Sequence, residues 1–156
     1  DKIVINSIIN DDKKLVDVLS KNYGNQCIVG SVDFKYVENN WSIYINSGNK
    51  KLETNLNEYI KNICELPIGE LYLNSIDNDG TGHGLVINAL NQITPNLNIP
   101  LILAGGVGNW QHIFQGLKDT RVDAVSTANL FNFVNDGLYN ARKEIYNSGI
   151  NIPLWE

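Results

Sequence analysis

The chain has 156 residues, which is the size of one ordinary domain and is enough to bury about two-thirds of the unfolded surface. Hydrophobic residues make up 43% and only two cysteines occur, which excludes a disordered chain and a disulfide scaffold. A net charge of −5 argues against nucleic acid as a partner. No apolar run is long enough to span a membrane and no secretory signal is visible, so we expect a cytoplasmic protein with no membrane partner.

The beginning of the sequence is unusual. The chain contains no methionine, and it starts inside a strand-like apolar run, Ile3-Val4-Ile5. We therefore expect a part of a longer chain, with residues 1–156 forming a single, incomplete domain.

Short β-rich segments alternate with amphipathic helical patterns along the chain. Each predicted strand is continuously apolar, as is typical of strands buried on both faces. In chain order, the prediction is strand 2–6, helix 11–22, strand 27–33, helix 56–66, strand 70–76, helix 85–93, strand 100–104, helix 110–117, strand 122–127 and helix 136–147.

This alternation predicts an α/β protein with parallel strands and right-handed crossovers. The pattern fits both an open doubly wound sheet and a (β/α)8 barrel. Five units are too few to close an eight-stranded barrel, so a barrel would lack three strands. One interruption occurs at residues 34–48, where two alternating runs about Asn39-Asn40 predict a β-hairpin in the loop after the second strand.

Polar groups follow the predicted strands at the edge where parallel α/β proteins carry their chemistry. Asp33 follows a long apolar run, so burial is expected to raise its carboxyl pKa and suit it to general acid/base catalysis. The alternative for Asp33 is helix capping or loop ordering. The other strand ends are Asn6-Ser7, Asn74-Ser75-Ile76-Asp77, Ala104-Gly105-Gly106 and Ala128-Asn129.

Two glycine-rich loops, at residues 75–84 and 104–109, are candidate ligand sites. Backbone N–H groups after the strand that ends at Ala104 can hold a phosphate, and Ala128 with the amide of Asn129 can reach the same group. The only histidines, His83 and His112, have no partner at ligand spacing, so we expect neither a metal nor another cofactor.

Several segments together resemble one family, the cyclase subunit of imidazole glycerol phosphate synthase. The segments occur in the family's order and spacing, and they span essentially the whole chain. The most specific is Ser-Ile-Asp-x-Asp-Gly-Thr at residues 75–81. The matching segments are residues 1–7, 26–35, 41–48, 69–81 and 104–109.

The resemblance implies a (β/α)8 TIM barrel and aligns the first predicted strand with the fourth strand of the family. The chain would then cover about strands 4 to 8, the C-terminal portion of the barrel, with the hairpin inserted after strand 5. The first three strands would be absent.

The resemblance also implies an activity in histidine biosynthesis. A glutaminase partner at the bottom of the barrel supplies ammonia, which crosses the barrel. At the top it reacts with phosphoribulosyl-formimino aminoimidazole carboxamide ribotide, giving imidazole glycerol phosphate and aminoimidazole carboxamide ribotide. Two aspartates transfer protons. Asp33 matches the one on the fifth strand and the other lies outside this sequence, so we expect the isolated chain to be inactive.

Further roles follow from the resemblance residue by residue. Lys2 and Glu70 match charged residues at the entrance for ammonia, for which the alternative is a surface ion pair. Asp1 matches a residue that faces the partner. The implied substrate contacts are Asn6, Ser7, Asn74, Asp79 and Gly80, and the implied second phosphate site is Gly105, Gly106, Ala128 and Asn129.

Departures from the family pattern include Asn74, Ala104 and Asn129. They leave open a relative of the cyclase that delivers ammonia for sugar amidation in surface-polysaccharide biosynthesis. A third hypothesis is a non-catalytic half-barrel, whose open sheet edges pair with another copy or with the missing half.

Overall fold

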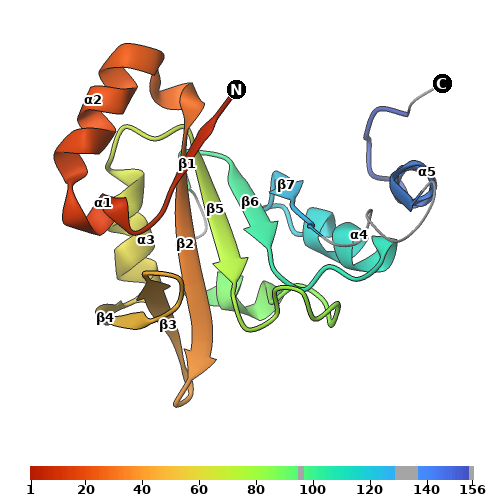
Figure 1. Ribbon diagram of the computed structural model, residues 1–156. Coiled ribbons are helices and arrows are strands. Elements are labelled where there is room, and N and C mark those ends of the chain that lie inside the picture. Colours follow the sequence, from red (N-terminus) through yellow and green to blue (C-terminus); the bar gives the residue numbers. More distant parts are fainter. Residues whose placement is uncertain (95–96, 129–136, 155–156) are drawn as a thin grey trace.

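The computed structural model describes residues 1–94, 97–128 and 137–154 (Figure 1). No helix within these ranges is both long and apolar enough to cross a membrane. The elements are β1 (Ile3–Ile5), α1 (Ile8–Asp11), α2 (Lys13–Tyr23), the 3-10 helix η1 (Asn25–Cys27), β2 (Ile28–Val37), β3 (Asn40–Ile45), β4 (Lys50–Asn55), α3 (Leu56–Cys64), β5 (Glu70–Ser75), the 3-10 helix η2 (Ile87–Gln92), β6 (Leu101–Ala104), α4 (Trp110–Lys118), β7 (Ala124–Val125) and α5 (Gly137–Asn147).

The described strands form one sheet, in which β1, β2, β5, β6 and β7 lie side by side in chain order and are all parallel. A doubly wound sheet reverses its strand order at a switch point, whereas a barrel adds each new strand beside the previous one. The order without reversal therefore confirms the TIM-barrel prediction and removes the doubly wound alternative. In Figure 1 the parallel strands run from β1 to β7 without a break in this order.

The two faces of the sheet differ in character. Apolar residues at alternate positions, such as Val32, Phe34 and Leu73, pack in the core with α2, α3 and η2. The opposite face, called here the inward face, carries polar groups. On β5 its residues are only half-buried, and on β1 Val4 is 61% exposed. The prediction of strands buried on both faces is thus wrong for β5 and β1, because the helices cover one side only.

The predicted hairpin is present and is formed by the second half of β2 with β3. Its turn is Glu38-Asn39, with φ values of 51° and 62°, so it lies one residue before the predicted Asn39-Asn40. Positive φ at both central residues is the type I′ turn that fits twisted strands. A further strand, β4, was not predicted from the sequence, and it pairs antiparallel with β3. Its Lys50 and Lys51 are exposed, as charged residues on edge strands usually are.

Local capping explains most helix starts. The Asp12 carboxylate caps α2 by accepting from the Leu15 amide at 3.3 Å. Asn109 caps α4 in the same way, with its side-chain oxygen 3.1 Å from the His112 amide nitrogen. Two predictions need correction. Residues 85–93 contain a 3-10 helix rather than an α-helix, in a segment whose two asparagines have a low propensity for helix interiors. The last strand has two residues instead of six.

Candidate functional site

Asp33 lies on the inward face of β2, between Tyr44 of β3 and Asn74 of β5 in the sheet register. The Asn74 amide donates to the Asp33 carboxylate at 3.4 Å. Burial raises the pKa of Asp33, while hydrogen bonds from Asn74 and Asn6 oppose the rise and the charge of Asp79 adds to it. The net pKa is above the ordinary value of 3.8, which confirms the direction expected from the sequence.

Ser7 lies beside this cluster, at the start of α1. Its hydroxyl donates to the Asn6 side-chain oxygen at 3.2 Å and accepts from the Asn46 amide at 2.8 Å. Asn46 belongs to the turn between β3 and β4, so the hairpin holds the loop after β1 in place. The structure thereby brings together Asn6, Ser7, Asp33 and Asn74, which the sequence singled out separately.

The two glycine-rich loops interlock at the carboxyl ends of β5 and β6. The Gly84 amide donates to the Gly106 carbonyl at 2.7 Å. A Cβ atom added at Gly106 would lie 2.2 Å from the Gly84 carbonyl oxygen, and one added at Gly108 would lie 2.4 Å from that of Gly82. Only glycine allows the two backbones to approach this closely.

A cavity of about 320 Å³ lies between these loops and the end of β7. It contains five residues that the sequence had assigned, namely Asp79, Gly80, Gly105, Gly106 and Ala128. Asn129 lies outside the described residues. Four further lining residues, Thr81, Gly82, Val107 and Gly108, belong to the two glycine-rich loops predicted as ligand sites, and Ala104 is one of the departures from the family pattern. The last three lining residues, Tyr72, Ser126 and Thr127, were given no role from the sequence.

The cavity and the Asp33 cluster adjoin each other. A Cβ atom at Gly105 would lie 3.0 Å from the Asn74 side-chain oxygen, and Asn74 in turn donates to Asp33. The carboxyl group and the glycine turn therefore lie on the same side of the sheet, at the same end of the strands.

The charges around the cavity limit what it can bind. Among the described lining residues Asp79 is the only one that carries a charge at neutral pH, and none is a lysine or arginine. An anion would therefore depend on backbone amides and on the positive end of α4. The Gly108 amide already donates to His112 Nδ1 at 3.1 Å, so it is engaged within the protein. The described residues include no group of three His, Cys, Asp or Glu side chains suited to a metal ion.

A second polar group lies at the opposite end of the strands, near the N-terminus in Figure 1. Lys2 forms an ion pair with Glu70 across the start of β1, β2 and β5. Asp1 beside it is exposed. The structure thus pairs Lys2 with Glu70 but separates both from Asp33 by the length of the inward face.

A known protein family matches the part of the chain that contains these sites. The family model described as "Histidine biosynthesis protein" matches residues 1–135. The chain belongs to this histidine biosynthesis family. It is HisF-like, and its five parallel strands with the hairpin on β2 are part of the family's TIM-barrel fold.

Curated relatives within the histidine biosynthesis family align over nearly the whole chain. Imidazole glycerol phosphate synthase subunit HisF of Flavobacterium johnsoniae is 32% identical over 99% of this chain and 61% of the relative. The putative subunit hisF2 of Parasynechococcus marenigrum is 35% identical over 99% and 58%. The HisF subunit of Chlorobaculum tepidum is 30% identical over 99% and 61%. The chain thus spans about three-fifths of the length of these relatives.

Proposed function

We propose that this chain supplies one acid/base group and one phosphate site of an imidazole glycerol phosphate synthase cyclase. In this proposal, residues 1–156 form the C-terminal part of the barrel. The substrate is the phosphoribulosyl-formimino ribotide, and the products are imidazole glycerol phosphate and aminoimidazole carboxamide ribotide. The observation that carries the proposal is the continuous contact from Asp33 through Asn74 to the glycine turn at the cavity.

The chemistry assigned to Asp33 is proton transfer. A raised pKa lies closer to neutral pH, so the carboxyl group can both donate and accept a proton during one turnover. Asn74 and Asn6 hold the carboxylate in place, and Ser7 extends the polar surface toward the substrate. One substrate phosphate lies at the amides around Gly106, in the cavity beside this cluster.

The other end of the inward face receives ammonia in the proposed reaction. The Lys2–Glu70 pair lies at the entrance, and Asp1 faces a glutaminase subunit. Glu70, Tyr72 and Asn74 occupy successive inward positions of β5, so this strand lines the way from the entrance to Asp33.

Complementation tests this proposal. The 156-residue chain is mixed with strands 1 to 3 of the Flavobacterium johnsoniae subunit, and ribotide turnover is measured with an ammonium salt. We expect turnover by the mixture only, and a loss of roughly 10²- to 10⁴-fold for Asp33→Asn. Asp17→Asn, at an exposed position of α2, is the matched control and should keep full turnover. Turnover by the chain alone, or full turnover by Asp33→Asn, would contradict the proposal.

Two other functions remain as alternatives. Retained phosphate binding without ribotide turnover in the mixture would favour the relative that serves sugar amidation. Among the described strands β1 pairs with β2 alone, and this open edge supports a further hypothesis in which β1 pairs with another copy of the chain. Sedimentation measures that association, and a stable monomer would contradict it.

A further inference from the structure

Tyr72 and Ser126 form a pair of hydroxyl groups inside the glycine-loop cavity. Tyr72 lies on β5, and Ser126 follows β7 directly. The Tyr72 hydroxyl donates to Ser126 Oγ at 3.4 Å, and both residues line the cavity. Fifty-four positions of sequence separate them, so only the fold brings them together.

The tyrosine ring has to cross β6 to make this contact. β6 lies between β5 and β7, and two strand spacings amount to about 9.6 Å. In the register of the sheet, Ala104 is the residue of β6 that precedes the glycine turn beside Asn74, and it is only 2% exposed. Tyr72 itself is opposite Ile102 of β6 in the register, and Ala104 lines the cavity together with Tyr72 and Ser126.

The pair has unused hydrogen-bonding capacity toward the cavity. Two hydroxyl groups carry two protons, and the contact between them uses one. A separation of 3.4 Å is also long for a hydrogen bond between hydroxyls, which normally measures about 2.7–2.8 Å. The cavity of about 320 Å³ is several times larger than the roughly 30 Å³ that one water occupies, so it has room for more than a phosphate group.

We propose that Tyr72 and Ser126 bind a hydroxyl group on the carbon chain of a phosphate monoester whose phosphate lies at the Gly105–Gly106 turn. The pair then determines specificity, because it favours polyol phosphates over alkyl phosphates of the same length. The inference rests on the proposed function for the position of the phosphate. It assigns to this chain a substrate contact that Asp33, Asn74 and the glycine loops do not provide.

Calorimetric titration of the 156-residue chain tests the inference with three probes, which are inorganic phosphate, propyl phosphate and glycerol 3-phosphate. Glycerol 3-phosphate should bind roughly 3- to 10-fold more tightly than propyl phosphate, as one or two additional hydrogen bonds predict. Tyr72→Phe and Ser126→Ala should each reduce this ratio to about one and leave the affinity for inorganic phosphate unchanged.

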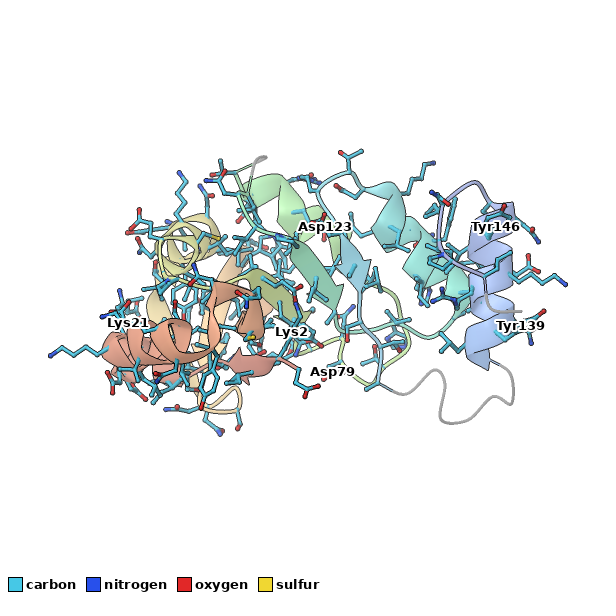
Figure 2. The ribbon with its side chains drawn as sticks, turned by 90° about the horizontal axis from the view of Figure 1, so that it is seen from above. Lys2, Lys21, Asp79, Asp123, Tyr139 and Tyr146 are labelled. Atoms are coloured by element: carbon cyan, nitrogen blue, oxygen red, sulfur yellow. The ribbon has the colours of Figure 1, made fainter. Side chains whose placement is uncertain are left out.

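The matched controls are Tyr139→Phe and Ser148→Ala. Figure 2 shows Tyr139 on α5, well to the side of Asp79 at the cavity. Ser148 donates to the Glu144 carbonyl just after that helix. Both controls should keep the wild-type ratio, and circular dichroism verifies the fold of all four variants.

The outcomes separate the inference from the proposed function. A preference for glycerol 3-phosphate that survives in both Tyr72→Phe and Ser126→Ala would overturn the inference and leave the complementation result untouched. Failure of inorganic phosphate to bind would overturn both. A preference that depends on the hydroxyl pair, in a chain that gives no ribotide turnover when complemented, would support the inference and count against the proposed reaction.

Discussion

Replacement of Gly106 by alanine tests whether the interlocked glycine loops shape the cavity. The new Cβ atom would lie 2.2 Å from the Gly84 carbonyl oxygen, well inside the 3.0 Å below which real Cβ contacts essentially never fall. Because that oxygen belongs to the backbone, a side-chain rotation cannot relieve the overlap. One of the two loops has to move by most of an ångström.

The cost of Gly106→Ala has two parts. The φ of 100° at Gly106 is unfavourable for any residue with a Cβ atom, by about 1–2 kcal/mol. Displacement of Gly84 also removes the hydrogen bond from its amide to the Gly106 carbonyl, which contributes about 0.5–1.5 kcal/mol. We expect a loss of about 1.5–3.5 kcal/mol in the free energy of unfolding.

The chain contains a matched control for the first part. Gly149 has a φ of 93°, but a Cβ atom there would have no neighbour within 4 Å. Gly149→Ala should therefore cost only about 1–2 kcal/mol. Urea unfolding measures both changes, and titration with inorganic phosphate should show weaker binding for Gly106→Ala alone. Equal destabilisation of the two variants, with phosphate binding unchanged in both, would refute the role assigned to the loop contact.

Three further predictions concern charge and backbone conformation. The raised pKa of Asp33 means that the folded protein holds this proton more tightly than the unfolded chain does, so the ionised carboxylate reduces stability at pH values above the raised pKa and has no effect well below 3.8. Asp33→Asn should then unfold at a higher urea concentration than the parent at about pH 7, and at a similar concentration near pH 3. A variant that is less stable than the parent at pH 7 would contradict this. The Arg121 guanidinium donates to both Asp119 carboxylate oxygens, at 2.8 and 2.6 Å, and to the Leu90 carbonyl at 2.6 Å, which lysine cannot reproduce. Arg121→Lys should cost about 1–2 kcal/mol at neutral pH in urea unfolding. The hydrogen bond from Arg121 lowers the pKa of Asp119. The difference in the free energy of unfolding between parent and variant should therefore shrink as the pH falls through that pKa. A difference that stays constant with pH would exclude the hydrogen bonds between Arg121 and Asp119 as its source. Glu38→Asn should raise the thermal midpoint, by about 0.5–1 kcal/mol in stability, because asparagine tolerates the φ of 51° better, and an unchanged midpoint would contradict the turn geometry.

Much of the fold could be predicted from local signals. β1, β5, β6 and the first part of β2 are largely apolar runs bounded by turn residues, and the Asp12 side chain marks the start of α2 by accepting from the Leu15 amide. The position of Asp33 at the end of such a run also predicted the direction of its pKa shift. These features depend on neighbours in sequence, so a single sequence contains them.

The features that were missed depend on distant partners. β4 is polar and charged, and it is a strand only because β3 offers its free edge. Tyr72 occupies the same face of β5 as Glu70 and Asn74, and this alternation was the one signal that could have drawn attention to it. Its partner Ser126 follows a two-residue strand, in which no periodicity can be recognised.

The hydrogen bond from the Asn46 amide to the Ser7 hydroxyl makes the turn between β3 and β4 a reporter of the loop after β1. A ligand that binds the Ser7 hydroxyl oxygen either displaces the Asn46 amide into solvent or shortens its hydrogen bond to Ser7. The rate of hydrogen–deuterium exchange at the Asn46 amide, which is far along the chain from β1, would then show whether a ligand occupies the mouth of the barrel. No attached label is needed for this measurement.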